Sequence, residues 1–381
     1  MLPAAAAGPL DDDDLLSEIL LRLPPLPSSL PRASAVCKRW RSLASDPAFS
    51  CRFRLHHRRN PPLLGCFHTG AEGISFEPTL EATDRVPPGR LSLQSDRGDL
   101  WFLGCRHGLV LIFGKTRLQF MVWDPVTGHQ HYIAHPPGLG VNKYMINGAV
   151  LRSSAGDVHF QVVLVAIHDG RALARVYSSE TRLWGNLITT PITSISKKNF
   201  LTYVSMEPAV LVGHALYWML SGTTHILEFD LERESLAVTR MPVYLSGAMW
   251  LKLMPADDGK LGILYVSGFT AQLWKRNTDC QGVASWGMGT TIELDKLLSL
   301  DPRADVVIIE GIAEDTHLVL LKTATSLFTL KLEPLEFKKL FDTKICHRYY
   351  PFESVYAAGS LASPEDQPST QRALVIWEVV L

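Results

Sequence analysis

Residues 10–49 read LDDDDLLSEILLRLPPLPSSLPRASAVCKRWRSLASDPAF, and this stretch decides how the chain is organised. Leu16, Ile19, Leu20 and Leu23 recur at helical spacing, which predicts an amphipathic helix. The carboxylates at 11–14 precede this helix, where they can cap free N–H groups, and the prolines at 24–25 end it. Its apolar face is larger than so small a unit can bury alone, so we predict that it binds a partner.

A second helix is predicted after Ser28-Ser29, with Pro31 in its first turn and an exit at Asp46-Pro47. One face of this helix carries small and apolar residues, namely Ala33, Val36, Cys37, Trp40 and Ala44. Helical periodicity alone also fits an ordinary hairpin of helices packed on the rest of the protein.

The order D-LL-x-EIL-x-RLP, then AVCKRWRSL, then DP-x-F resembles the F-box over residues 10–49. This resemblance implies binding to a Skp1-like adaptor and, through it, to a cullin-RING ubiquitin ligase. It implies that the residues docking into the adaptor are Leu15, Leu16, Ile19, Leu20, Leu23 and Pro24. Val36, Cys37 and Trp40 would pack the helices together and complete the surface.

We predict four segments: a disordered N-terminus (1–9), the F-box (10–50), a basic and proline-rich linker (51–62), and an all-β domain (63–381). The basic run in the linker comprises Arg52, Arg54, His56, His57, Arg58 and Arg59. A nuclear-import or phosphate-binding patch is one interpretation of this run. A solvated helix end followed by a linker is favoured, because the run is short and diluted by histidine.

The remainder of the chain shows short apolar runs separated by turns, and these runs recur as a unit. An apolar strand begins each unit, at 109–113, 160–167, 215–220, 261–266 and 318–321. A second strand follows at 119–124, 173–178, 225–230, 271–276 and 326–331, and a third often follows after a polar turn. Equivalent positions lie 54, 52, 45 and 56 residues apart, near the ~40–50-residue period of propeller blades.

The predicted fold is therefore a small all-α helical unit followed by an all-β domain, a β-propeller of about six blades. A pair of β-sandwiches or an irregular barrel is the alternative. Segments such as FLGCRHGLVLI, MVWDPVTGHQ and YYPFESVYAA resemble the propeller-like associated domain of plant F-box families. We expect the strand 372–381 to pair near 63–68 and close the ring, and a weak helix near 293–300.

Composition limits the classes of partner that the chain is expected to bind. The formal net charge of −1 gives no support for nucleic-acid or membrane-surface binding, and no apolar run reaches the ~20 residues of a membrane span. Six scattered cysteines without a CxxC pair predict reduced thiols in the cytosol or nucleus.

Nucleotide-binding and hydrolase motifs do not occur in the sequence, so we expect no cofactor. His129 and His131 would share a strand face, but too few further ligands accompany them to predict a metal. Cys105 and His107 could suggest a nucleophile pair, although a buried strand-end cysteine is favoured. The aromatic residues at repeat-equivalent positions are predicted to form the core between blades: Trp123, Tyr177, Phe229 and Trp274.

The resemblance to the F-box and its associated propeller implies a non-catalytic substrate-receptor subunit of an SCF (Skp1–cullin–F-box) ubiquitin ligase, whose propeller binds an unidentified target protein. Two alternatives remain open. One is a scaffold that acts with its adaptor outside any ligase. The other is a propeller enzyme with an unrelated helical leader, which would need converging carboxylates or a metal in the central channel.

Overall fold

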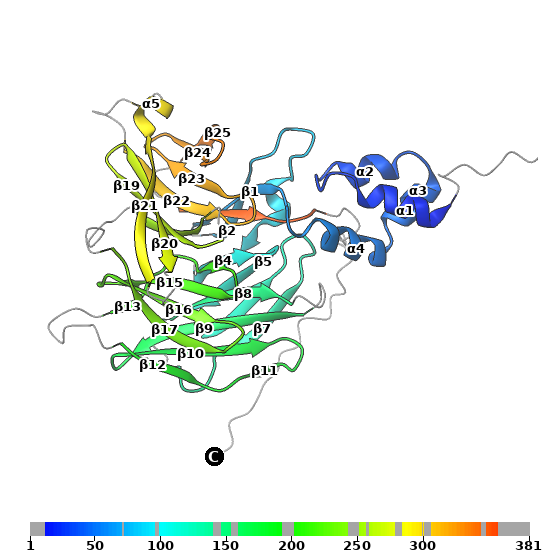
Figure 1. Ribbon diagram of the computed structural model, residues 1–381. Helices are drawn as coiled ribbons and strands as arrows, with labels where there is room; N and C mark the ends of the chain where they lie inside the picture. The colour runs from blue at the N-terminus through cyan, green and yellow to red at the C-terminus, as the bar shows by residue number, and fades with distance from the viewer. Residues whose placement is uncertain are drawn as a thin grey trace, which may run out of the picture.

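The computed structural model separates a helical unit from a ring of β-sheets (Figure 1). It describes residues 12–70, 72–95, 99–139, 146–153, 159–192, 202–242, 251–256, 259–278, 284–298, 300, 306–343 and 348–356. The predicted N-terminal segment 1–9 and the strand 372–381 lie outside these ranges.

Four helices make up the helical unit, where two were predicted. They are α1 (Asp13–Leu21), α2 (Ser29–Ser34), α3 (Lys38–Ala44) and α4 (Pro47–His57). The predicted second helix is divided because Cys37 is extended (φ −160°, ψ 171°) and begins α3 as its N-cap. Asp46-Pro47 does not end the unit but starts α4: the Asp46 side chain accepts from the Phe49 N–H, and Pro47 occupies the first turn. The predicted linker covered residues 51–62. Residues 51–57 belong to α4 instead, so the prediction is wrong for them.

Six antiparallel sheets form the propeller blades, which confirms the predicted fold and the count of about six. Blade 1 contains β26 (Tyr349–Glu353), β1 (Leu63–Gly70), β2 (Gly73–Pro78) and β3 (Leu93–Gln94). Blade 2 contains β4 (Leu100–Arg106), β5 (Leu109–Gly114), β6 (Gln119–Trp123) and β7 (Gln130–Ala134). Blade 3 contains β8 (Ile146–Arg152), β9 (Phe160–His168), β10 (Arg171–Ser178), β11 (Leu183–Trp184) and β12 (Ile188–Pro191).

The other three blades repeat this arrangement. Blade 4 contains β13 (Tyr203–Val204), β14 (Val210–Val212), β15 (Ala215–Ser221), β16 (His225–Asp230) and β17 (Ser235–Arg240). Blade 5 contains β18 (Leu251–Pro255), β19 (Leu261–Ser267), β20 (Thr270–Thr278) and β21 (Ala284–Glu293), and α5 (Leu294–Leu298) follows it. Blade 6 contains β22 (Ile308–Ala313), β23 (Leu318–Lys322), β24 (Ser326–Lys331) and β25 (Glu336–Asp342). The predicted weak helix near 293–300 is α5.

Each propeller core lies between two neighbouring blades. Trp123 packs between blades 1 and 2, Tyr177 between blades 2 and 3, Phe229 between blades 3 and 4, and Trp274 between blades 4 and 5. All four side chains are buried, so the prediction that they form inter-blade core is confirmed. Burial on both faces explains why the middle strands of each blade read as continuous apolar runs.

The sequence pattern missed the first strand of the blades, which faces the central channel. The apolar strands that were predicted to begin each unit, β5, β9, β15, β19 and β23, are instead preceded in their own blades by at least one further strand. Strands such as β4 (LWFLGCR) and β22 (IIEGIA) carry glycine and charged residues because one face lines the channel rather than the core.

Strand β26, near the C-terminal end of the described residues, closes the ring. β26 pairs with β1 on one edge, and β2 pairs with β1 on the other, over Gly65–His68. Closure through the N-terminal strand is as expected, while the predicted partner strand at 372–381 lies outside the described residues.

Candidate functional site

The helical unit begins with a well-defined cap. The Asp12 carboxylate accepts hydrogen bonds from the Asp14 and Leu15 N–H groups at 2.8 and 3.2 Å. Asp13 instead forms an ion pair with Arg39 at 2.7 Å, which ties the start of α3 to the start of α1. The acidic run therefore caps α1, as predicted, and also joins α1 to α3.

The core of the helical unit is formed by residues that were predicted to bind the adaptor. Leu16 and Leu20 are 0% exposed and pack with Phe49 and Phe53 of α4. The prediction that these two leucines dock into a partner is wrong, because α4, which the sequence pattern did not reveal, covers that face of α1. Leu23 and Trp40 are partly buried against the same core.

Several apolar residues of the helical unit stay exposed. Leu15 is 50% exposed, Ile19 is 39% exposed and Val36 is 63% exposed, and Cys37 and Pro24 are exposed as well. Val36 and Cys37 were predicted to pack the helices together, and this is wrong because both lie exposed in the connection between α2 and α3. We define the docking face as Leu15, Ile19, Pro24, Val36 and Cys37.

Helix α4 joins the helical unit to the propeller, and its basic residues have structural partners. Arg52 forms an ion pair with Glu18 at 2.7 Å, and His57 Nε2 lies 2.9 Å from the Leu21 carbonyl oxygen. Arg58 donates to the carbonyl oxygens of Arg152 and Ser153 at 3.0 and 2.9 Å. For these residues the structural interpretation of the basic run holds.

The propeller also contributes to the helical unit directly. Val355, just after β26, is buried in the same cluster as Leu16 and Phe53. On the other side, the Ser28 N–H donates to Asp84 at 3.0 Å. The helical unit is thereby held at the side of the ring, as Figure 1 shows.

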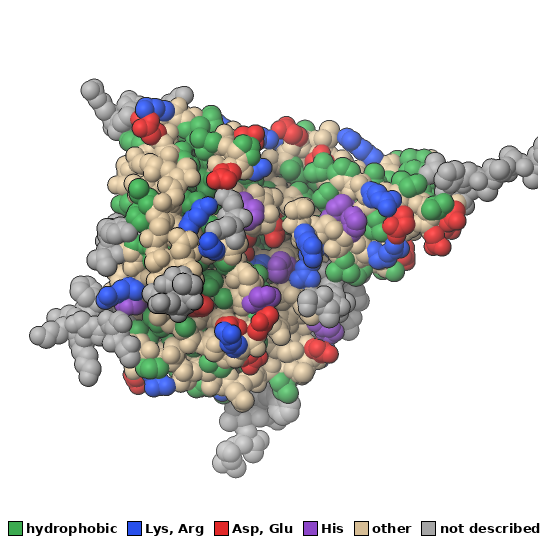
Figure 2. All heavy atoms as spheres, viewed as in Figure 1, with side chains coloured by type: hydrophobic (Ala, Val, Ile, Leu, Met, Phe, Trp, Pro, Cys, Tyr) green, Lys and Arg blue, Asp and Glu red, His purple; other side chains and the backbone are tan. Residues whose placement is uncertain are grey.

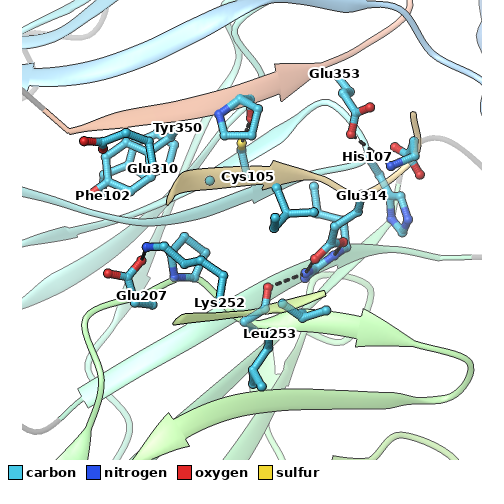
Figure 3. A pocket seen from close by; sticks show the side chains of 18 of the residues that line it. Phe102, Cys105, His107, Glu207, Lys252, Leu253, Glu310, Glu314, Tyr350 and Glu353 are labelled. Atoms are coloured by element: carbon cyan, nitrogen blue, oxygen red, sulfur yellow. Dashed lines mark hydrogen bonds and ion pairs between the residues drawn. The ribbon is translucent and has the colours of Figure 1, made fainter. Parts of the chain in front are cut away.

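A cavity of about 70 Å³, the channel cavity, lies where the first strands of five blades converge (Figure 3). Arg106 of β4 reaches across it: its guanidinium donates to both Glu314 oxygens at 2.6 and 2.7 Å and to the Ala209 carbonyl at 2.7 Å. One side chain of blade 2 therefore links blades 4 and 6. Lys252 pairs with Glu207, and Lys322 pairs with Glu310 at 3.0 Å.

Carboxylates do converge in the channel, which the sequence did not reveal. Glu207, Glu310 and Glu314 each have a cationic partner, so their charges are already compensated. A signal was present: a charged residue lies eight or nine positions before the apolar strand in three repeats, at Glu207, Lys252 and Glu310. Within the described residues, no group of three or more His, Cys, Asp or Glu side chains is placed to hold a metal ion.

Two channel carboxyls have raised pKa values. Burial raises the pKa of Glu353 to about 7, and the negative charge of Asp315 adds to the rise. Burial and the nearby Glu314 carboxylate raise the pKa of Asp315 to about 6. The folded protein therefore holds protons that the unfolded chain releases near pH 4.

We predict that this pair makes the protein less stable as pH rises. Stabilisation from a raised carboxyl pKa is present in acid and is lost as pH increases through about 6 and about 7. The urea midpoint should fall between about pH 5 and about pH 8, and Glu353→Gln should flatten this dependence. Glu336→Gln, an exposed glutamate of β25, is the control. An unchanged slope in Glu353→Gln would contradict the prediction.

Cys105 and His107 do not form a reactive pair. The Cys105 thiol lies 2.9 Å from the Pro351 carbonyl oxygen, and burial raises its pKa, which disfavours the thiolate. Burial lowers the pKa of His107 to about 3, with the charges of Arg106, Arg58 and Arg152 adding to the effect. Cys105 lies near the end of β4, as predicted, but it is partly rather than fully buried.

Comparison with known proteins agrees with this architecture. Residues 12–52 match the F-box domain, and residues 101–357 match the family described as "F-box protein AT5G49610-like, beta-propeller". The chain belongs to this family of F-box propeller proteins. An F-box followed by a propeller is the arrangement of a substrate-receptor type of protein, in a family that is generally non-enzymatic.

Individual relatives come from Arabidopsis thaliana. The F-box protein At5g49610 is 25% identical to this F-box propeller protein, covering 88% of this chain and 92% of the relative. The F-box/kelch-repeat protein At3g61590 is 26% identical, covering 55% of this chain and 51% of the relative. Among solved structures, the Cps50 (Swd1) β-propeller domain of Myceliophteria thermophila matches with a TM-score of 0.40 at 10% identity, covering 70% of this chain and 80% of that one. No helix in the described ranges has the length and apolar character needed to cross a membrane.

Proposed function

We propose that this F-box propeller protein is a substrate receptor of an SCF ubiquitin ligase. Its helical unit binds a Skp1-like adaptor, which brings the cullin-RING module, and its propeller binds a target protein. The observation that carries the proposal is the docking face, which stays exposed although the helical unit has already filled its own core with Leu16, Leu20 and Phe53. Apolar side chains of this size contribute ~1.5–3 kcal/mol each when they become fully buried.

The chain's contribution to the reaction is proximity. A target that is held beside a ubiquitin carrier experiences an effective concentration of roughly millimolar. The helical unit is fixed to the propeller through Arg58 and Val355, so a target on the propeller keeps a constrained position relative to the adaptor. We place this activity in the cytosol, the nucleus or both.

Co-purification with a Skp1-like adaptor tests the proposal. The double variant Leu15→Asp/Ile19→Asp should weaken adaptor binding about 100-fold, since two apolar anchors become charged at an interface that must exclude water. Met288→Asp, which changes a 60% exposed apolar residue on β21, should bind the adaptor like the unaltered chain.

The outcomes separate the alternatives. A chain that binds no adaptor contradicts the proposal. A chain that binds adaptor but never recruits cullin favours the scaffold outside a ligase. Ubiquitin transfer is then measured on proteins that co-purify with the propeller, comparing the double variant with Met288→Asp.

A further inference from the structure

A second cavity, the basic cavity, lies beside helix α4 at the ends of strands from blades 2 and 3. Its volume is about 380 Å³, within the range of ligand sites. Three arginines and three histidines line it, with a single carboxylate: Arg54, Arg152, Arg182, His129, His131, His159 and Asp124. Figure 2 shows basic and histidine side chains gathered on the face between the helical unit and the centre of the ring.

Hydrogen bonds hold Asp124 and Arg152 in place at the basic cavity. Asp124 accepts from the N–H groups of Val126 and Thr127 at 3.1 and 3.2 Å, which closes the turn between β6 and β7. The same carboxylate accepts a hydrogen bond from Arg152 Nη2 at 2.9 Å, while Arg152 Nε donates to the His107 carbonyl oxygen at 2.8 Å. Asp124 is thus used to orient Arg152, so the cavity keeps an excess of positive charge.

Arg182, in the turn between β10 and β11, also lines the basic cavity. Its backbone is left-handed (φ 58°), a conformation that fixes where the side chain leaves the turn. No ion-pair partner is found for the exposed Arg182 side chain within the part of the chain that the structure describes. His131, hydrogen-bonded to the Tyr177 hydroxyl at 3.0 Å, has a pKa lowered by burial and by the positive charges of His129 and Arg182.

The basic cavity adjoins the channel. An intervening cavity shares Arg54, Asp124, Thr127 and Arg152 with it, and shares His107 and Glu353 with the channel cavity. The three cavities therefore share lining residues from the ring centre past α4 to blades 2 and 3.

We infer that the basic cavity receives an anionic side chain, a phosphate or a carboxylate, on a segment of the target protein. This rests on the proposed function, because it names the chemistry of the target that the propeller holds. Planar guanidinium groups bind such anions through charge-assisted, bidentate hydrogen bonds. A nucleic acid is disfavoured, since the chain has a net charge of −1 and a polyanion needs cationic contacts along its whole length.

Retention of degenerate peptide libraries on the immobilised full chain tests the inference. The three libraries carry phosphoserine, glutamate or serine at one fixed position, so an unknown sequence context is averaged. We expect the phosphoserine or the glutamate library to be retained about 10-fold more than the serine library, and retention to fall as salt is raised. Which of the two is retained identifies the anion.

Arg182→Asn should reduce that retention about 10-fold, and asparagine tolerates the left-handed backbone. The matched control is Arg171→Asn at the opposite end of β10, an exposed arginine whose side chain donates to Thr189. Equal retention of all three libraries, equal effects of the two variants, or preferential binding of a single-stranded oligonucleotide would overturn the inference. Adaptor binding is measured on the same samples, so a chain that retains anionic peptides without adaptor contradicts only the proposed function.

Discussion

Replacing Glu314 with alanine is expected to lower the free energy of unfolding by about 3–5 kcal/mol. The Arg106 side chain is 6% exposed, and Glu314 is its ion-pair partner, holding it through two hydrogen bonds. Without this carboxylate, a guanidinium that spans blades 2, 4 and 6 stays in the channel with its charge uncompensated. The urea-unfolding midpoint of the full chain, followed by tryptophan fluorescence, measures the loss.

The double variant Arg106→Met/Glu314→Leu is the control that isolates the charge. A buried ion pair replaced by apolar groups of similar volume is often neutral or stabilising, so most of the loss should be recovered. If Glu314→Ala costs less than about 1 kcal/mol, Arg106 reaches water and the channel is not the closed electrostatic link described above.

Replacing Phe53 with alanine should unfold the helical unit and abolish adaptor binding while the propeller remains intact. Phe53 is 0% exposed and packs on Phe49 and His57 within α4, at the centre of the helical core. The loss expected for such a truncation is about 3–5 kcal/mol. A unit this small has a low free energy of unfolding, so a loss of this size unfolds it.

Limited proteolysis and adaptor co-purification distinguish the two parts. Cleavage of Phe53→Ala within the helices, with a resistant propeller fragment and no bound adaptor, is the expected result. Phe337→Ala, at an exposed phenylalanine of β25, should behave like the unaltered chain. Simultaneous unfolding of the propeller in Phe53→Ala would show instead that the helices and the ring form one cooperative unit.

Local sequence determined the features that depend on neighbouring residues. Asp12 caps α1 where the acidic run predicts a helix start, and the DPVTG turn at 124–128 joins two strands as its residues require. The apolar strands and their spacing predicted about six blades, because a strand buried on both faces needs an apolar side chain at nearly every position.

Tertiary structure alone decided which apolar residues of the helical unit stay exposed. A helical period identifies an apolar face but not what covers it, and α4 covers Leu16 and Leu20 while Leu15 and Ile19 remain outside. The channel charges became visible only when the ring closed, since Arg106 and Glu314 are 208 residues apart and meet across blades. Periodicity and turn chemistry are properties of a short segment, whereas burial and ion pairing depend on the residues that folding brings from elsewhere in the chain.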